Sequence, residues 1–276
     1  MASKLILITG VSSGFGRALA QESLARGYLV AGTVRSSQAA REFESLHPTF
    51  ATARILDVTN FKAIDSVVSD IEQSAGPIDV LVNNAGYGHE GILEESPLEE
   101  MTRQFGVNVF GAVAMMKAVL PYMRQRRSGR ILNITSMGGY ITMPGIAYYC
   151  GSKFALEGIS EVVAKEVAQF GIKVTALAPG SFRTDWAGRS MVRSTRTISD
   201  YDALFDPIRN TRMEKSGRQL GDPAKAAQAM LQVIESESPP EHLLLGSDAM
   251  TLVRRKLAQT SSSIDEWEAL SRSTDG

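Results

Sequence analysis

The stretch that decides the fold spans residues 5–16 and reads Leu-Ile-Leu-Ile-Thr-Gly-Val-Ser-Ser-Gly-Phe-Gly. Its first part, Leu5–Ile8, is a short apolar run of the kind that forms a buried strand. The glycines that follow allow a tight turn and a close approach of the backbone to a ligand. If a helix starts there, its free N–H groups favour a pyrophosphate. A turn without a ligand is the alternative. The residues expected to hold the phosphates are Gly10, Ser12, Ser13, Gly14, Phe15 and Gly16.

Short apolar runs recur along the chain between segments with helical spacing. Most runs are continuous, which is typical of strands covered on both faces of a parallel sheet. Between two of them, apolar residues from Leu156 to Phe170 step by three and four, as on one face of a helix. This alternation predicts an α/β fold with a doubly wound parallel sheet flanked by helices. The seven predicted strands are Leu5–Ile8, Tyr28–Val34, Ala53–Val58, Ile78–Val82, Arg130–Thr135, Ile172–Leu177 and His242–Leu245.

The chain has 276 residues, of which 43% are apolar, and we expect a single domain over 1–276. Ser96, Pro97 and Glu99 form a capping-box pattern that predicts a helix start. Residues 182–220 have little periodicity and are interpreted as a substrate lid or a loop. Residues 261–276 form a polar tail whose end is expected to fray. The lid arginines, expected to be solvated or to meet an acidic substrate, are Arg183, Arg189, Arg193, Arg196, Arg209 and Arg212.

The composition excludes several classes of protein. The 29 basic and 30 acidic residues nearly cancel, which argues against nucleic-acid binding and against a polybasic membrane binder. Cys150 is the only cysteine, so the chain forms no internal disulfide, which fits a cytoplasmic protein. No apolar stretch is expected to be long enough to span a bilayer. No metal site is expected.

Three motifs occur in order along the chain. They are Thr9-Gly-xxx-Gly14-x-Gly16, Asn83-Asn84-Ala85-Gly86 and Tyr149-xxx-Lys153. Together they resemble the short-chain dehydrogenase/reductase family in its single-domain branch, and the resemblance covers nearly the whole chain. The stretch from Tyr149 to Gly158 is similar to the hydroxysteroid- and retinol-dehydrogenase-like members. The resemblance implies a Rossmann-type fold and an oxidoreductase that uses NAD(P).

Tyr149 and Lys153 lie four residues apart, so they share one face of a helix. We expect the ammonium to favour the phenolate and to lower the pKa of the tyrosine. Ser136 ends a predicted strand, where ligands bind in open α/β sheets. The resemblance makes Tyr149 the general acid/base and Ser136 the group that bonds the substrate oxygen. It also gives Lys153 the tasks of tuning Tyr149 and binding the nicotinamide ribose.

Asn108 lies on the otherwise apolar stripe of Met101, Phe105, Ala112 and Met115. A buried amide requires hydrogen-bond partners. The resemblance makes Asn108 the catalytic residue that holds a water in a proton relay, and a structural asparagine is the alternative. The resemblance further implies cofactor contacts from Asp57, Val58, Asn84, Ala85, Gly86, Tyr149, Lys153, Pro179, Gly180 and Thr184.

The end of the second predicted strand selects the nicotinamide. An acid there would bond the ribose 2′-hydroxyl of NAD, but this position holds Arg35. A guanidinium matches the 2′-phosphate of NADP instead. NADP(H) is therefore favoured, with NAD(H) as the alternative, and a solvated arginine is the structural alternative.

The sequence thus predicts an enzyme that interconverts a ketone or aldehyde and an alcohol on a hydrophobic substrate. A non-catalytic NAD(P)-sensing protein, a methyltransferase and an epimerase are the alternatives. A homodimer or homotetramer is expected to form through the helices that start at Ser96 and Tyr149. The residues expected to line the pocket are Tyr87, Met137, Tyr140, Met143, Ile146, Phe182 and Trp186.

Overall fold

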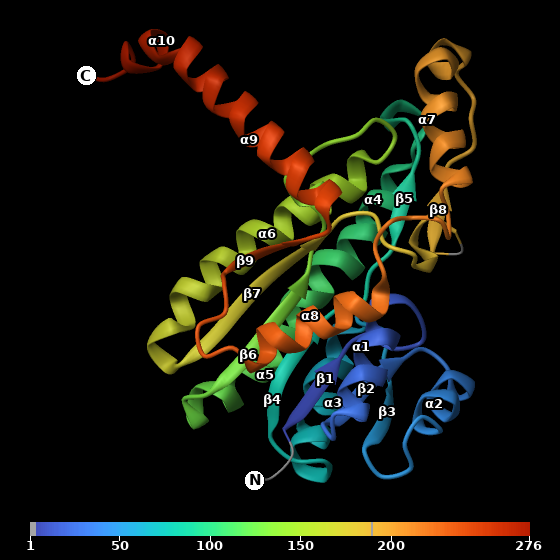
Figure 1. The fold of residues 1–276 in the computed structure, drawn as a ribbon, viewed down its shortest axis with the longest axis vertical. Helices are drawn as coiled ribbons and strands as arrows, with labels where there is room; N and C mark the ends of the chain where they lie inside the picture. The colour runs from blue at the N-terminus through green and yellow to red at the C-terminus, as the bar shows by residue number, and fades with distance from the viewer. Residues whose placement is uncertain (1–3, 189) are drawn as a thin grey trace.

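A parallel sheet of seven strands forms the centre of the molecule (Figure 1), in a computed structural model that describes residues 4–188 and 190–276. The strand order is β3-β2-β1-β4-β6-β7-β9. Strands β2 and β3 are added on one side of β1 and the later strands on its other side, so the topological switch point lies between β1 and β4. The predicted doubly wound α/β fold is confirmed. The strands are β1 (Leu5–Ile8), β2 (Leu29–Val34), β3 (Ala51–Ile55), β4 (Ile78–Asn83), β6 (Gly129–Ile134), β7 (Ile172–Pro179) and β9 (His242–Leu245).

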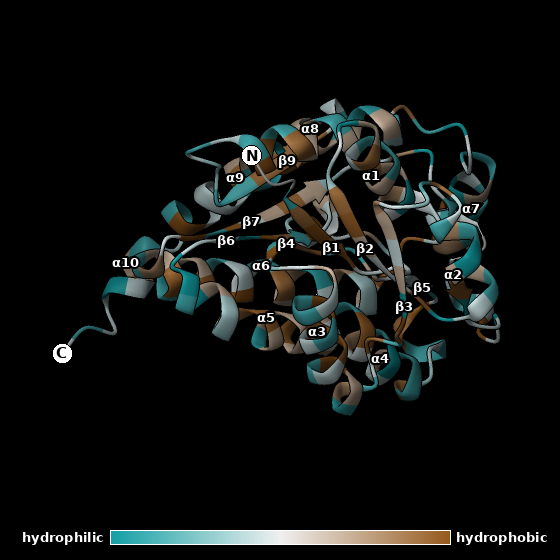
Figure 2. Cartoon of the chain, turned by 90° about the horizontal axis from the view of Figure 1, so that it is seen from below, coloured by the Kyte–Doolittle hydropathy of each residue, from teal (hydrophilic) through white to brown (hydrophobic). Residues whose placement is uncertain are grey.

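Helices cover both faces of this sheet (Figure 2). Along β1, Ile6 and Ile8 pack into the core under one helical layer, and Leu5 and Leu7 pack into the core under the other. Burial on both faces explains why the strands read as continuous apolar runs. One layer consists of α1 (Gly14–Ala25) and α8 (Pro223–Glu235). The other consists of α3 (Phe61–Ser74), α5 (Ala112–Arg126) and α6 (Ala147–Val167). The short α2 (Ser37–Glu44) packs on β3.

The third strand ends earlier than predicted. Asp57 turns the chain instead, because its Oδ1 accepts hydrogen bonds from the Thr59 amide at 2.9 Å and from the Thr59 hydroxyl at 2.7 Å. The predicted strand Ala53–Val58 is therefore wrong at both ends, and Asp57 lies beyond the carboxyl end of β3.

The predicted capping box at Ser96 is also wrong. The hydroxyl of Ser96 donates to the Ile92 carbonyl at 2.7 Å, and α4 (Leu98–Phe105) starts after Pro97 without a side-chain cap. A π-helical segment, Gly106–Gly111, joins α4 to α5. A π-helical insertion of this kind is often found at a functional site.

Together α4, the π-helical segment and α5 form a helical run, Leu98–Arg126, of 29 residues. By length and composition this run could cross a membrane, with a mean hydropathy of 1.4 in its most apolar window. The expectation that no stretch reaches that length is therefore wrong. In this fold 44% of that window is buried, and Met115, Val119 and Met123 pack in the core under the sheet.

Residues 182–220, called the lid segment below, are more regular than predicted. They contain β8 (Met191–Arg193), which pairs with β5 (Gly88–Glu90), and α7 (Asp202–Glu214). Arg189 lies outside the described residues. The chain then ends in α9 (Ser247–Glu266) and α10 (Glu268–Arg272), which project away from the body (Figure 1). Most of the predicted polar tail is thus helical.

Candidate active site

The glycine-rich turn leaves β1 and enters α1 as predicted. Gly10 has a φ of +73° and Gly14 a φ of +58°, both in the left-handed region that glycine tolerates. A Cβ on Gly16 would lie 2.3 Å from the Gly10 carbonyl oxygen, so only glycine fits there. Within the part of the chain that the structure describes, the amides of Gly14, Phe15 and Gly16 have no hydrogen-bond partner. The Ser13 side chain does not cap the helix either, so this turn can accept a pyrophosphate.

A second motif is locked onto this turn. The Thr9 hydroxyl oxygen accepts from the backbone amides of Asn84 and Ala85, each at 3.0 Å. The Asn84 side-chain amide donates to the carbonyls of Thr9 and Gly10, each at 2.9 Å. The structure therefore brings these two predicted cofactor segments together, although they lie about 75 residues apart.

Ser136, Tyr149 and Lys153, called the catalytic set below, come together at the carboxyl end of β6. All three side chains are buried. Lys153 Nζ lies 5.8 Å from the centre of the Tyr149 ring and donates to the Ile134 carbonyl at 2.8 Å. Ser136 follows β6, and its hydroxyl accepts from the Gly138 amide at 3.0 Å.

The electrostatics of this set differ from the expectation. Burial raises the pKa of Tyr149 well above its ordinary value, and a hydrogen bond with Ser136 offsets this only in part. Burial also lowers the pKa of Lys153 to about 8. The expected net lowering of the tyrosine pKa is not found, because burial outweighs the contributions that lower it. At neutral pH Tyr149 is a protonated phenol, which is a proton donor.

Asn108 is buried in the π-helical segment, close to the lysine. A Cβ on Gly86 would lie 3.1 Å from Asn108 Oδ1 and 3.7 Å from Lys153 Nζ. The Asn108 amide nitrogen donates to the Tyr87 carbonyl at 3.1 Å and to the Ser152 hydroxyl at 3.0 Å. Its oxygen accepts from the Tyr87 amide at 3.1 Å. These bonds fix the loop after β4, and a role in a water relay stays a prediction.

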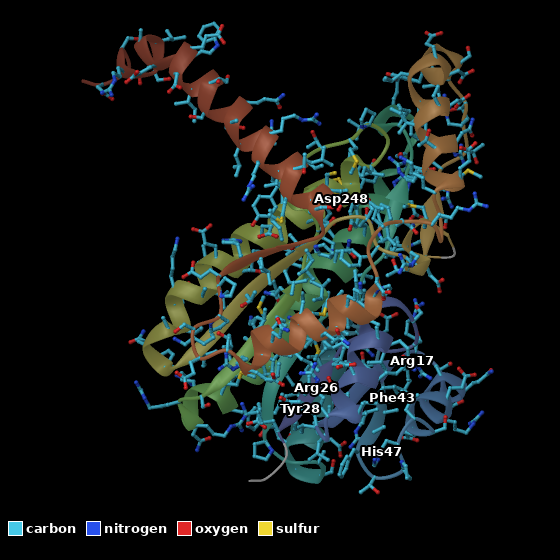
Figure 3. All side chains as sticks on the ribbon, viewed as in Figure 1. Arg17, Arg26, Tyr28, Phe43, His47 and Asp248 are labelled. Carbon is cyan, nitrogen blue, oxygen red and sulfur yellow. The ribbon has the colours of Figure 1, made fainter. Side chains whose placement is uncertain are left out.

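The turn after β7 contacts the glycine-rich turn as predicted. A Cβ on Gly14 would lie 3.8 Å from the Thr184 side chain, and Gly180 donates its amide to the Leu245 carbonyl at 2.8 Å. Sequence reasoning missed Asp248, at the base of α9 (Figure 3). Its Oδ2 accepts from the Ser181 amide at 2.8 Å, so it holds the turn that includes Pro179 and Gly180.

Arg35 and Asp57 follow the carboxyl ends of β2 and β3. Arg35 is exposed and forms no ion pair with any described residue. Bonds from Thr59 and the positive charge of Arg35 lower the pKa of Asp57. Val58 is buried, and a Cβ on Gly111 would meet its side chain at 2.8 Å. The guanidinium of Arg35 is therefore available to a phosphate at the adenosine end.

One apolar wall of the site is contributed by Met143, Ile146 and Trp186, which pack with Tyr149 and Cys150. The Trp186 ring lies 4.8 Å from the Tyr149 ring, and its Nε1 is buried without an acceptor among the described residues.

Two of the expected lining residues lie elsewhere. The Tyr140 hydroxyl donates to Glu157 at 2.9 Å. Phe182 packs edge-on against Phe15 in the core, with ring centres 5.1 Å apart.

The lid segment is held down by two buried carboxylates that sequence reasoning did not single out. Glu90 binds Arg193 at 3.1 Å, Arg209 at 3.3 Å and also Arg212. Glu95 binds Arg196 at 2.9 Å. These arginines are paired inside the protein, so the expected solvated face is wrong for them. No local signal reveals the pairs, because the partners lie about 100 residues apart.

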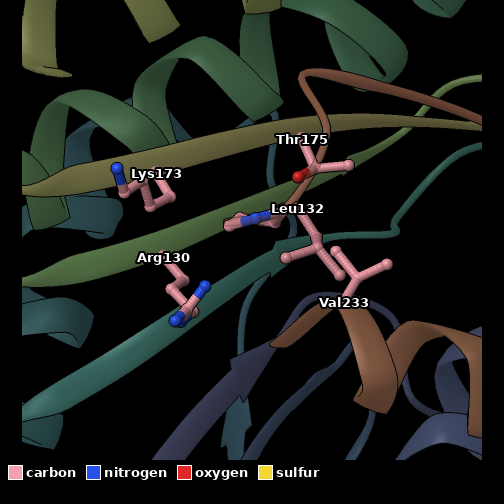
Figure 4. Close-up of a pocket in the computed structure, with 6 residues that line it drawn as sticks. Arg130, Leu132, Lys173, Thr175 and Val233 are labelled. Carbon is pink, nitrogen blue, oxygen red and sulfur yellow. The ribbon is translucent and has the colours of Figure 1, made fainter. Parts of the chain in front are cut away.

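Figure 4 shows a small hollow lined by side chains of β6, β7 and α8. It contains Arg130 and Lys173, which come from the amino-terminal halves of their strands. Ligands of open α/β sheets bind beyond the opposite, carboxyl ends. This hollow is therefore not the candidate active site.

Comparisons with known proteins agree with this geometry. Residues 4–193 match the family model described as short chain dehydrogenase. A crystal structure of a short-chain dehydrogenase from Streptomyces avermitilis is 40% identical, with a TM-score of 0.92 and full coverage of both chains. A 3-ketodihydrosphingosine reductase from Bacteroides thetaiotaomicron is 39% identical over 89% of each chain.

A structure of ElxO with NADP bound has a TM-score of 0.76 and 25% identity, covering 91% of this chain and all of that one. The glycine-rich turn and the match to the family model point to the same conclusion. The protein is a member of the short chain dehydrogenase family and an oxidoreductase that uses a nicotinamide cofactor, with NADP favoured.

Proposed function

We propose that this enzyme reduces a ketone or aldehyde on a largely apolar molecule, with Tyr149 as the proton donor. The observation that carries the proposal is the buried catalytic set beside the glycine-rich turn. A phenol whose pKa is raised by burial stays protonated at neutral pH. It can therefore supply a proton to a carbonyl oxygen that becomes an alkoxide.

NADPH, when bound, supplies a hydride to the carbonyl carbon. Tyr149 then gives its proton to the carbonyl oxygen, and Ser136 orients that oxygen through its hydroxyl. Lys153 lies next to the phenol and stabilises the phenolate that remains after proton transfer. The reverse oxidation uses the same groups.

Arg35 supports NADPH over NADH, because it is an exposed cation without an ion pair among the described residues. A charge-assisted bond to the 2′-phosphate contributes about 1.5–3 kcal/mol. Arg35→Ala should therefore weaken NADPH binding about tenfold or more and leave NADH binding nearly unchanged. Titrations followed by nicotinamide fluorescence measure both affinities. Equal weakening for the two cofactors would contradict this role.

The substrate class is supported by the apolar wall beside Tyr149, which is formed by Met143, Ile146 and Trp186. The relative named 3-ketodihydrosphingosine reductase is named for a ketone. We therefore expect ketones with an apolar chain to be better substrates than small polar ones. A panel of both, assayed by NADPH consumption, tests this, and a preference for charged sugars would contradict it.

The alternative is a non-catalytic NAD(P)-sensing protein of the same fold. It would bind NADPH as tightly as the enzyme but show no turnover with any member of the carbonyl panel. Loss of turnover in Tyr149→Phe with retained NADPH binding separates the two, because a sensor has no turnover to lose.

We further propose that the enzyme acts in the cytoplasm on a small molecule, without nucleic acid or membrane as a partner. A homodimer or homotetramer is expected through the helices that start near Ser96 and Tyr149, which are the helical run Leu98–Arg126 and α6. Exposed apolar side chains on them support this contact, namely Phe110, Phe154 and Val162. Light scattering measures the number of copies.

A further inference from the structure

The C-terminal helix is largely exposed, and its sequence has a low intrinsic preference for the helical conformation. From Arg254 to Gly276 every residue is exposed. The stretch Thr260-Ser261-Ser262-Ser263 consists of weak helix formers. Isolated helices of this length are marginal in water, and most gain their stability from packing of one face. A packing partner would therefore supply the stability that this helix lacks by itself.

The apolar residues of α9 repeat every seven positions. Met250, Leu257 and Ile264 form one series. Val253 and Trp267, the C-cap of α9, form a second series three residues further on, with the polar Thr260 between them. Alternating steps of three and four are the pattern of a two-helix seam. α9 ends at its C-cap, Trp267, whose backbone leaves the helical region (φ −103°, ψ 11°). Hydrogen bonds from the Trp267 amide to the Ser263 carbonyl and from the Ser271 amide to the Trp267 carbonyl connect α9 to α10.

The first part of this seam is buried against the body of the protein, and the rest is exposed to solvent. Val253 is buried against the body. Leu257, Ile264 and Trp267 are 57%, 64% and 56% exposed, and the helix extends beyond the body (Figure 1). Nothing in the described part of the same chain covers these three side chains.

The charges beside the seam identify the partner. Arg254, Arg255 and Lys256 lie in the half of the helix near the body. Apart from Asp248, which bonds Ser181, the acidic residues lie near the C-terminus. The acidic residues are Asp265, Glu266 and Glu268. An antiparallel second copy places the basic half of each helix beside the acidic half of the other. A parallel copy would place like charges together, which is unfavourable.

The centre of the helix fits such a pair. Lys256 and Glu266 are equally distant from Ser261, so a two-fold axis at Ser261 puts each beside the other in the partner. The small side chains at Thr260, Ser261 and Ser263 surround that axis, where each helix meets its own copy. Small residues there let the two helices approach closely.

A hollow at the base of α9 lies where the end of an antiparallel partner would pack. It has a volume of about 390 Å³ and is lined by Ser247, Met250, Thr251 and Arg254. With the axis at Ser261, the last residue of the partner's α9 lies opposite Lys256, next to this hollow, and the partner's α10 follows from there. Its apolar end, which carries Leu270, would lie over the hollow.

We propose that α9 pairs with α9 of a second copy of this chain as an antiparallel two-helix seam centred on Ser261. This contact lies apart from the catalytic set and from the α5 and α6 faces. A lipid surface is the rival occupant for an amphipathic helix. It is disfavoured because three acidic residues lie beside Trp267, at the end that would enter the membrane surface.

The first test measures molar mass by sedimentation equilibrium for the full-length chain. Ile264→Asp should halve the mass at micromolar concentration, whatever contacts the other faces make. Ser262→Asp is the matched control, because it adds the same charge next to the seam on its outer face, and its mass should stay unchanged. Equal masses for native chain and Ile264→Asp would overturn the proposal.

The second test fixes the orientation. Cys150 is the only native cysteine and is buried, so an added surface cysteine is the one thiol open to a short bis-maleimide linker. Ser261→Cys should cross-link to itself efficiently, and Leu257→Cys should not, because the antiparallel axis separates its two copies. Cross-linking of Leu257→Cys alone would indicate a parallel pair and overturn the model.

The third measurement addresses the rival occupant. The native chain is sedimented with vesicles of phosphatidylcholine and phosphatidylglycerol. We expect it to stay in the supernatant with an unchanged molar mass. Vesicle binding that Ile264→Asp abolishes, together with a native mass equal to that of the variant, would assign the helix to lipid and overturn self-pairing.

Discussion

The lid segment contacts the catalytic set through Trp186 and Tyr149, but different interactions hold the two regions in place. Ser136, Tyr149 and Lys153 come from β6 and α6, within one short stretch of chain, and their positions follow from the sheet and its helices. The lid segment is held by ion pairs on Glu90 and Glu95, with partners about 100 residues away. The comparison indicates that substitutions can disrupt the catalytic set and the lid segment separately.

Tyr149→Phe should give the largest effect, because it removes the proton donor without changing the packing of the ring. A general acid typically contributes about 10²–10⁴-fold, so kcat should fall in that range. Steady-state NADPH consumption measures it, and thermal unfolding should match that of the native protein. Retention of most turnover would remove Tyr149 from the mechanism.

Glu90→Gln should disrupt the lid segment and leave the catalytic set folded. Removing one partner of a buried ion pair costs about 3–5 kcal/mol, because the remaining charges stay buried without a counter-charge. We expect faster proteolysis within residues 182–220 and a higher KM for the carbonyl substrate.

Glu94→Gln is the control for this variant. Glu94 also bonds a residue of the lid segment, Tyr201, at 2.7 Å, but it is exposed. Its substitution should cost less than about 1 kcal/mol. Equal proteolysis of the two variants would show that burial of Glu90 does not hold the lid segment.

Lys153 gives the catalytic set a pH dependence in the range above pH 8. Its pKa is about 8 in the folded protein and about 10.5 when unfolded. Between these values the unfolded chain binds more protons, so this group makes the free energy of unfolding rise with pH. The rise should be about 2 kcal/mol between pH 8 and pH 10.

Urea unfolding of the cofactor-free native protein and of Lys153→Met, at several pH values, measures this rise. Other titrating groups are common to both proteins, so they cancel in the difference. A difference that falls with pH would show that the lysine is stabilised as a cation in the folded state.

Trp186→Phe should give the smallest effect, at the point where the lid segment contacts the catalytic set. The substitution keeps an aromatic ring beside Tyr149 and removes a buried N–H donor that has no described acceptor. If the substrate accepts from Nε1, KM should rise about fivefold with kcat nearly unchanged, as for a neutral hydrogen bond of about 1 kcal/mol. A drop in kcat alone would place Trp186 in the chemistry.

Much of the fold was predictable from local pattern. The run Leu5–Ile8 was located correctly because a buried parallel strand is a continuous apolar segment. The run His242–Leu245 was also located correctly, although its strand is only partly buried. The third strand was misplaced because the bonds between Asp57 and Thr59 turn the chain. The start of α4 was misplaced because the Ser96 hydroxyl finds a carbonyl elsewhere. Local patterns do not show which of two nearby partners a polar side chain selects.

The sequence by itself determined the fold class and the glycine-rich turn, because each depends on residue type and short spacing. It also supplied the candidate members of the catalytic set. Only the tertiary structure decided that the pKa of Tyr149 is raised and not lowered, since the direction of the shift depends on burial. It also decided which carboxylates bind the lid arginines. The tertiary structure also decided that α9 is exposed. Its seven-residue repeat indicates a contact with another chain only because no other part of the described chain covers it. Burial and long-range pairing are properties of the folded chain, so no window of sequence contains them.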